Sequence, residues 1–415
     1  MSDTLKKIII IVIFFLAVVG LAYLIYYLFF KPPPAEIPTI PPGQVLPSGQ
    51  LPSISEGNVN RIINENLNAG LPSIRQIPEE AIISPVASGG YTRVNDTVPT
   101  NVTAPTLAKD NGLNYFNSTE GRFYKKSVDG SVTRMSDQRF YSVETVTWSP
   151  DGESAVLEYP DGSNILYDFN QNKQITLPKE FQDFAFTPSG QEIVAEVIGP
   201  QEENNWIVTA NPDGSNIQFV ERLGDQSANV LITPSPNSQV VALFRKNRSA
   251  DSQEVLFIGR SGENFKSLVT NGRGFEGQWT PQGDRLLYSV YSSENGFRPT
   301  LWSVEASGDN IGLGNLDLGL NTWSYKCAMA ADNATAYCGV PDYLPEGSGI
   351  FPGLATDSFD SFYKVNLATG QRTLLAQPVG NQSGYAVQQI FLSSDEKVLY
   401  FQDEKTGGLY NINLE

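Results

Sequence analysis

A short phrase that recurs along the chain constrains the fold more than any other feature. Residues 148–152 read WSPDG, and an apolar run follows this turn directly. Asp-Gly turns favour tight hairpins because glycine tolerates a positive φ. Similar phrases, each with an apolar run on both sides of a polar turn, occupy seven stretches: 106–116, 146–159, 184–197, 231–244, 277–290, 327–340 and 389–402.

The repeating unit is longer than this hairpin. A second pair of strand-like runs follows each copy, as in NILYDFNQNKQITL over residues 164–177. Four short strands repeated every 40 to 50 residues or so are typical of β-propeller blades. The sequence therefore predicts an all-β domain over residues 86–415. We expect a seven-bladed β-propeller of four-stranded antiparallel blades, with six or eight blades as the alternatives.

The two ends of this domain suggest how the ring closes. The last copy is followed by one further strand-like run, over residues 408–414, and lacks a fourth. A strand-like run without a partner, GGYTRVNDTV, covers residues 89–98 before the first copy. We expect it to supply the missing outer strand of the last blade, because this leaves fewer exposed strand edges.

The N-terminal region has a different character. Residues 8–30 are uncharged and mostly apolar, and as a helix they would extend about 34 Å, enough to cross a bilayer. The run ends in aromatic residues rather than a small-residue cleavage site, which favours an uncleaved anchor over a signal peptide. Lys6 and Lys7 precede it, so residues 1–7 are expected in the cytoplasm. Proline recurs throughout residues 31–85, which predicts an extracytoplasmic extended linker.

Charge and composition exclude several kinds of function. The chain has 28 basic and 45 acidic residues, which argues against nucleic acid as a partner. It has no histidine, which removes histidine bases and histidine metal sites. No catalytic residue, metal ligand or cofactor is assigned from the sequence.

The phrases WSPDG, FTPSG and WTPQG, each followed by an apolar strand, resemble the repeats of TolB-like propellers, which are related to WD-repeat propellers. The resemblance covers about residues 100–415 and implies a propeller that binds a partner at one mouth. Anchored propellers also occur in dipeptidyl-peptidase-type enzymes. Those continue into a hydrolase domain with a G-x-S-x-G elbow and a histidine, and this chain contains neither.

Cys327 and Cys338 are the only cysteines, and each lies five residues from the turn at 332–333. This register places them opposite each other across a hairpin, so we expect a disulfide of modest stabilising effect. Two buried free thiols are the alternative.

Other residues belong to the repeat itself. Trp148 and Trp279 occupy the same position in two copies, where packing between blades is expected rather than ligand stacking. Turn chemistry accounts for Asp151, Gly152 and Gly283. The same holds for the other Asp-Gly turns, Asp129, Asp161 and Asp213, and calcium binding is the alternative for these aspartates and for Asp151.

The longest insertion covers residues 340–362 and falls between the second and third strands of the sixth blade. Long loops that carry aromatic residues are common binding devices on rigid scaffolds. The alternative is a loop that packs on the propeller's own face. Its candidate binding residues are Tyr343, Leu344, Phe351, Phe359 and Phe362.

These features predict a single-pass protein of a bacterial cell membrane, with residues 8–30 in the bilayer and the propeller outside the cytoplasm. Its expected function is non-catalytic binding of a protein or cell-surface partner. The alternative is a propeller enzyme, a hydrolase or lyase that uses carboxylates at the central channel. A cluster of inward-facing carboxylates would favour the enzyme.

Overall fold

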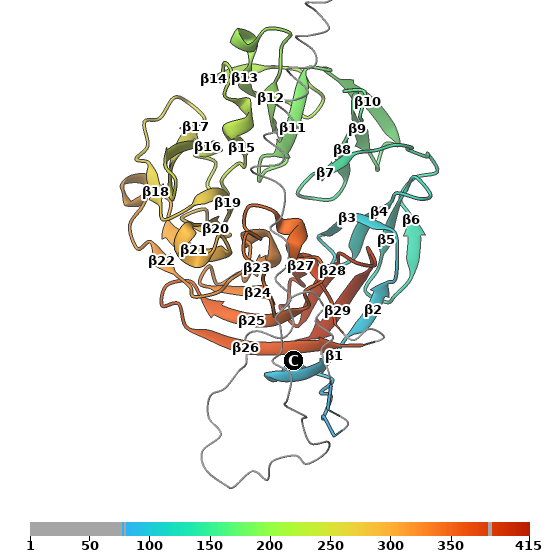
Figure 1. Ribbon diagram of the computed structural model, residues 1–415. Coiled ribbons are helices and arrows are strands. Elements are labelled where there is room, and N and C mark those ends of the chain that lie inside the picture. Colours follow the sequence, from blue (N-terminus) through green and yellow to red (C-terminus); the bar gives the residue numbers. More distant parts are fainter. Residues whose placement is uncertain (1–76, 79, 381–383) are drawn as a thin grey trace, which may run out of the picture. The chain divides into compact units, whose positions relative to one another are not determined.

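Seven β-sheets form a closed ring in the computed structural model, which describes residues 77–78, 80–380 and 384–415 (Figure 1). The predicted seven-bladed, all-β propeller is confirmed. The expected segments 1–7 and 8–30, and the linker up to residue 76, lie outside the described residues. Within the described residues, no helix has the length and apolar character needed to cross a membrane.

The first four blades each contain four strands. Blade 1 contains β3 (Val102–Leu107), β4 (Leu113–Asn117), β5 (Arg122–Lys126) and β6 (Val132–Arg134). Blade 2 contains β7 (Thr145–Trp148), β8 (Ser154–Glu158), β9 (Asn164–Asp168) and β10 (Lys173–Leu177). Blade 3 contains β11 (Phe181–Phe186), β12 (Ile193–Val197), β13 (Trp206–Ala210) and β14 (Gln218–Arg222). Blade 4 contains β15 (Val230–Ile232), β16 (Val240–Ser249), β17 (Ser252–Gly259) and β18 (Leu268–Thr270).

The other three blades complete the ring. Blade 5 contains β19 (Arg273–Trp279), β20 (Arg285–Tyr291), β21 (Pro299–Glu305) and β22 (Leu316–Asp317). Blade 6 contains β23 (Cys327–Met329), β24 (Thr335–Pro341), β25 (Asp360–Asn366), β26 (Arg372–Val379) and β1 (Gly90–Arg93). Blade 7 contains β27 (Val387–Leu392), β28 (Val398–Asp403), β29 (Leu409–Asn413) and β2 (Asn95–Val98). The connections include six short 3-10 helices: η1 (Glu202–Asn204), η2 (Ser227–Asn229), η3 (Ser293–Asn295), η4 (Gly308–Asn310), η5 (Ser324–Lys326) and η6 (Pro352–Ala355).

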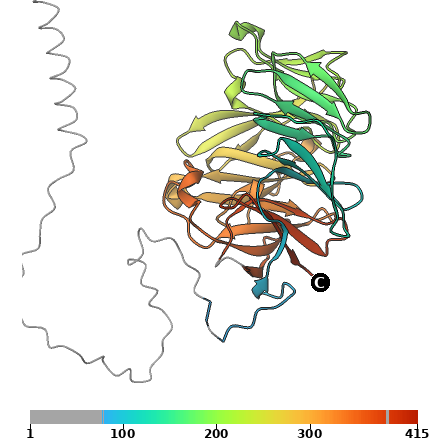
Figure 2. The same ribbon diagram turned by 90° about the vertical axis from the view of Figure 1, so that its right-hand side faces the viewer.

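The first strand of each blade lies nearest the centre of the ring (Figure 1). WSPDG-type turns join the first and second strands at one mouth, here called the turn mouth. The second and third strands are joined at the opposite mouth, here called the loop mouth. Figure 2 shows the ring from the side, with the insertion of blade 6 in orange.

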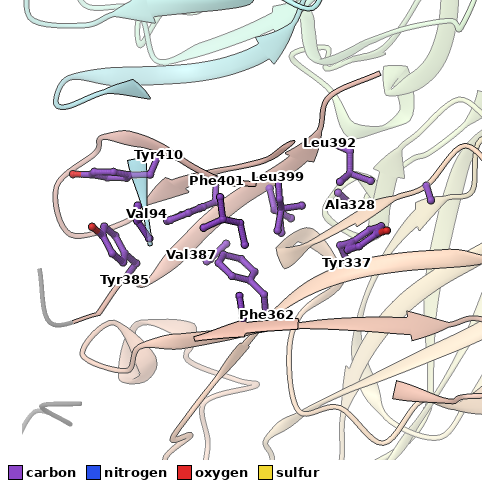
Figure 3. Packing of buried hydrophobic residues seen from close by; sticks show 14 residues of the cluster. Val94, Ala328, Tyr337, Phe362, Tyr385, Val387, Leu392, Leu399, Phe401 and Tyr410 are labelled. Carbon is purple, nitrogen blue, oxygen red and sulfur yellow. The ribbon is translucent and has the colours of Figure 1, made fainter. Parts of the chain in front are cut away.

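Apolar side chains on both faces of each blade hold the ring together. In β8, Ala155 and Leu157 pack against residues of blade 1, whereas Val156 packs against blade 3. Alternation along a strand sends successive side chains to opposite faces, so one short apolar run contributes to two interfaces. Figure 3 shows the interface of blades 6 and 7, where Phe362 and Phe401 are fully buried.

The repeat phrase links neighbouring blades through fixed hydrogen bonds. The Trp148 indole N–H donates to the carbonyl of Ala104 in blade 1 at 2.7 Å, and Trp279 donates to Thr233 in blade 4 at 3.0 Å. At the turns, Gly152 and Gly283 have φ values of 70° and 71°. Their carbonyls accept from asparagine side chains of the preceding blades: Asn114 and Asn237. Asp151 accepts from the Ser149 hydroxyl and the Glu153 N–H.

The cysteines of blade 6 are joined. Cys327 and Cys338 are register partners in β23 and β24, and a disulfide connects them. Both are buried between blades 5 and 6. The bridge closes a short loop, so its contribution is at most about 3 kcal/mol.

The structure divides the closing strand that the sequence predicted over residues 89–98. Asn95–Val98 pairs antiparallel with β29 and completes blade 7, which joins the two ends of the ring. Gly90–Arg93 instead pairs parallel with β26, so blade 6 has five strands rather than four. The outer edges of blades 6 and 7 both need covering, and one straight strand cannot follow two edges. The chain passes between them at Val94, whose N–H donates to Val379.

Ring closure predicts a specific loss of stability. The Asn411 side chain in β29 donates to the Thr97 hydroxyl at 2.8 Å and accepts from Asn95 at 3.2 Å. We expect Asn411→Ala to lower the free energy of unfolding by about 1–3 kcal/mol, because it leaves the buried Thr97 and the half-buried Asn95 without these bonds. Urea unfolding measures this change. Asn413→Ala is the matched control, since no side-chain hydrogen bond of Asn413 is found in the described structure, and equal losses would contradict the assignment.

Candidate functional site

The longest connection of the described ring, residues 342–359 between β24 and β25, lies at the loop mouth. Strands β16 and β17 extend as a long hairpin whose turn contains Asp251. The Asp251 carboxylate accepts from the N–H and hydroxyl of Ser293, in the loop of blade 5. Residues 244–254, which include Arg245, Lys246 and Arg248, lie within this hairpin. The insertion of blade 6 lies beyond the blade 5 loop.

The insertion is braced against the neighbouring blade. The Arg298 side chain of blade 5 donates to the carbonyl of Leu344 at 2.8 Å. The N–H groups of Gly347 and Gly349 donate to backbone carbonyls of the blade 5 loop. Leu344 is buried with Trp323 and Ala355 in a small apolar cluster. The loop is therefore held at several points along its length.

The five candidate binding residues fall into two groups. Leu344, Phe359 and Phe362 are at most 7% exposed, so they fix the loop and strand in place. Phe359 also lies under the Lys405 ammonium group, 4.5 Å from its ring centre. Tyr343 and Phe351 are 54% and 66% exposed.

Two residues that the sequence analysis did not single out share this exposure. Ile350 and Leu354 are 42% and 51% exposed and lie on either side of Phe351 in the chain. Together, Tyr343, Ile350, Phe351 and Leu354 are called the apolar tip below. A signal was present, since IFPGL is an apolar run with no alternation and a proline, which does not suit a strand.

A buried ion pair lies where the insertion returns to the sheet. The Lys326 ammonium group of η5 is 3.1 Å from the Asp360 carboxylate, and both side chains are at most 5% exposed. The same carboxylate accepts from the Val387 N–H of blade 7 at 2.6 Å. The pair therefore ties the end of the insertion to blades 6 and 7.

Three carboxylates approach each other near the inner strands of blades 2 and 3. Asp183 lies on β11, and Glu158 and Glu196 lie on the second strands of the two blades. Asp183 has a φ of 53° at a shift in the pairing of β11 with β12. Such a bulge redirects a side chain. We call Glu158, Asp183 and Glu196 the acidic group.

Two carboxyl groups of the acidic group have raised pKa values. Burial raises the pKa of Glu158 from 4.5 to about 7, with a further contribution from the charge of Asp183. Burial and the same charge raise the pKa of Glu196 to about 7, partly offset by Arg245. Glu196 is 3% exposed, and no side-chain hydrogen bond or ion pair of Glu196 is found within the described residues. Two carboxyl groups here therefore titrate near neutral pH.

Charged residues of both signs follow the acidic group around the inner side of blades 3, 4 and 5. Arg245 donates to backbone carbonyls of blades 4 and 5 and lies between Glu196 and Glu276. Burial raises the pKa of Glu276, and it also raises that of Tyr325. A cavity of about 600 Å³ lies beside Tyr325, and Gln278 and Glu404 also line it.

Carboxylates at the central channel are expected from the sequence only in general, without any particular residue. The stretch FQDFAF over residues 181–186 carried a usable signal, because Phe181 and Phe184 are three apart and interrupt the strand alternation. Both phenylalanines are buried, as a bulge between them requires. Bringing Asp183 near Glu158 and Glu196, however, depends on the packing of two blades.

The turn aspartates have local partners. The carboxylates of Asp129, Asp161 and Asp213 each accept from the N–H and hydroxyl of the serine two residues on. Across the residues that the structure describes, no three His, Cys, Asp or Glu side chains are placed to hold a metal ion. Turn chemistry accounts for these aspartates.

Comparison with known proteins identifies the fold. No protein-family model and no curated protein matches the sequence. A chain of a mitotic checkpoint complex is 13% identical, with a TM-score of 0.52 over 86% of this chain and 100% of its own. The Cps50 (Swd1) β-propeller domain of Myceliophteria thermophila is 12% identical, with a TM-score of 0.51 over 78% and 100%. An oligogalacturonate lyase of Vibrio parahaemolyticus is 9% identical, with a TM-score of 0.49 over 78% and 93%. The first two establish a propeller fold with WD-repeat-like neighbours.

The raised pKa values predict how stability depends on pH. The folded chain retains protons on Glu158 and Glu196 that the unfolded chain releases above its ordinary pKa of 4.5. The free energy of unfolding should therefore fall as pH rises from about 4.5 through about 7. At pH 8, we expect Glu158→Gln and Glu196→Gln each to stabilise the fold by on the order of 1 kcal/mol.

Urea unfolding between pH 4.5 and 8 measures this effect. Each variant should flatten the pH dependence, whereas the exposed control Glu221→Gln on β14 should leave it unchanged. A pH dependence that is the same in all three variants would show that the acidic group does not titrate in this range.

Proposed function

We propose that this chain is a binding module whose propeller captures a protein partner through the apolar tip at its loop mouth. The observation that carries this proposal is the apolar tip itself. Four large apolar side chains of one loop, Tyr343, Ile350, Phe351 and Leu354, are each at least 42% exposed. Several large exposed apolar groups in one loop are typical of an interaction site.

Rigidity of the loop supports this proposal. Arg298 and the glycine N–H groups hold the insertion against blade 5, and the Lys326–Asp360 pair holds its end. A loop that is already ordered loses less conformational entropy when it binds. Aromatic side chains such as Tyr343 and Phe351 are also the residue types that carry most of the energy in protein interfaces.

The charges around the tip indicate the character of the partner. Glu346, Asp342 and Asp357 belong to the same insertion, and Glu294 belongs to the loop of blade 5 that braces it. A partner with an apolar pocket and a basic rim would be complementary in charge. The net charge of -17 disfavours nucleic acid.

The sequence supplies the cellular setting of the proposal. An apolar segment over residues 8–30, with Lys6 and Lys7 before it, favours a single-pass anchor with the N-terminus in the cytoplasm. The proline-rich residues 31–85 would then hold the propeller away from the membrane on the extracytoplasmic side. The TolB-like character of the repeats favours a bacterial cell membrane.

Substitution at the apolar tip tests the proposal. Crosslinking of the full-length chain in its native membrane, followed by mass spectrometry, should join the insertion to one other protein. We expect Phe351→Ser to reduce the yield of that crosslinked product at least tenfold, because the partner's pocket loses its aromatic anchor.

Phe219→Ser is the matched control, since Phe219 on β14 of blade 3 is 64% exposed, close to the 66% of Phe351. The control should give the wild-type yield. Crosslinks that join the insertion only to its own propeller, or equal losses in both variants, would overturn the proposal.

A second candidate function is carboxylate-dependent hydrolysis or elimination at the central channel. The acidic group favours it, because a carboxylic acid with a pKa near 7 can serve as a general acid or base at neutral pH. Neither role requires a histidine. The substrate would enter at the loop mouth, where the acidic group lies.

Release of reducing ends from a panel of neutral and anionic polysaccharides tests this second function. We expect Glu158→Gln or Glu196→Gln to abolish turnover, and Glu221→Gln to retain it. No release by the wild-type chain, or release that both channel variants retain, would remove the acidic group as an active site.

A further inference from the structure

A cleft between the outer parts of blades 4 and 5 has a different character from the apolar tip and the acidic group. Its volume is about 550 Å³, within the range of about 300–1,000 Å³ typical of small-molecule sites. Trp302 of β21 lines it, together with the amide side chains of Asn271, Asn295 and Asn321. The remaining polar lining includes the carboxylates of Glu294 and Asp317.

The chain forms this cleft because the outer strand of blade 5 is short. Strand β22 contains only two residues, which pair with Trp302 and Ser303 of the seven-residue β21. Beyond Asp317 the chain bends at Gly319, which has a φ of 63° and donates its N–H to the Asp317 carboxylate at 2.7 Å. The long β16–β17 hairpin of blade 4 contributes Asp251 to the opposite wall.

The indole of Trp302 is held in one orientation. Its ring is nearly parallel to that of Tyr288, at an interplanar angle of 18° and a centroid distance of 6.3 Å. Its N–H donates to the Thr300 hydroxyl at 2.9 Å. With the N–H satisfied, the indole offers the cleft an apolar surface rather than a hydrogen-bond donor.

The polar groups around the indole have hydrogen-bond donors and acceptors that remain available to a ligand. Asn271 and Glu294 are exposed, and neither side chain forms a hydrogen bond to another described residue. The Asn321 amide donates to Pro299, which leaves its carbonyl oxygen as an acceptor. Amides and carboxylates together offer both donors and acceptors around a flat apolar surface.

We propose that this cleft is a binding site for a neutral saccharide. A sugar ring has an apolar C–H face that can lie on the indole, and hydroxyl groups that both donate and accept hydrogen bonds. Among the described residues, no lysine or arginine lines the cleft, and three carboxylates do, which disfavours uronates and phosphorylated ligands. A quaternary ammonium ligand would require several aromatic walls and would leave the amides unused.

Saturation-transfer NMR on the full-length chain tests this proposal, with cellobiose, maltose and N,N′-diacetylchitobiose as neutral probes. Digalacturonate and choline serve as the charged comparisons. We expect saturation transfer to at least one neutral disaccharide and none to the charged probes. Trp302→Ala should raise the dissociation constant at least tenfold, and Asn271→Ala should raise it at least threefold.

Matched controls separate this site from the rest of the molecule. Trp206→Ala removes another half-buried tryptophan, on β13 of blade 3, and should retain the wild-type dissociation constant. Phe351→Ser at the apolar tip should also retain it, so this proposal and the protein-binding proposal can fail separately. Asn271 is exposed, so its variant is expected to fold even if Trp302→Ala does not. No transfer to any neutral probe, stronger transfer to a charged one, or unchanged affinity in Asn271→Ala would overturn the proposal.

Discussion

Burial of apolar side chains between neighbouring blades is the constraint on which the rest of this structure depends. A single strand contributes to two interfaces, as β8 does with Val156 and Leu157 on opposite faces. A blade at an open end would expose one such face to water, so the ring must close. Strand β2 closes it from the N-terminal side of the domain, and the side chains of Asn95 and Asn411 connect the two ends of the described propeller. The rigid ring then holds long loops at the loop mouth.

Local repetition allowed most of the ring to be predicted from the sequence. Every copy of the phrase contains the first two strands of one blade, because turn residues and strand alternation are local properties. The division of residues 89–98 between two blades was not predictable in this way. Whether Gly90–Arg93 follows β26 or β29 depends on which sheet edge is left uncovered after folding. The acidic group was missed for a related reason, since its members come from two blades.

The loop mouth illustrates two ways of managing buried charge. Lys326 and Asp360 are buried together, and the carboxylate also accepts from Val387, so each charge has a partner. Removing one partner of such a pair costs more than the pair contributes, which makes it a device for fixing geometry. It lies where the insertion rejoins the sheet, and a fixed end there keeps the apolar tip in place. The Lys326–Asp360 pair therefore fits a structural role.

The acidic group is compensated less completely, since burial outweighs both the Asp183 backbone hydrogen bond to Glu158 and the Arg245 charge near Glu196. Glu196 is nearly as buried as Asp360, yet Arg245 only partly offsets the effect of burial and of Asp183 on its pKa. The positive φ of Asp183, 53°, adds backbone strain. A lysine near Glu196 would relieve the electrostatic cost, and a glycine at 183 would relieve the backbone cost. Groups that depart from local rules without compensation are concentrated at functional sites. The contrast between these two buried acids therefore favours ligand or proton chemistry at Glu196, and architecture at Asp360.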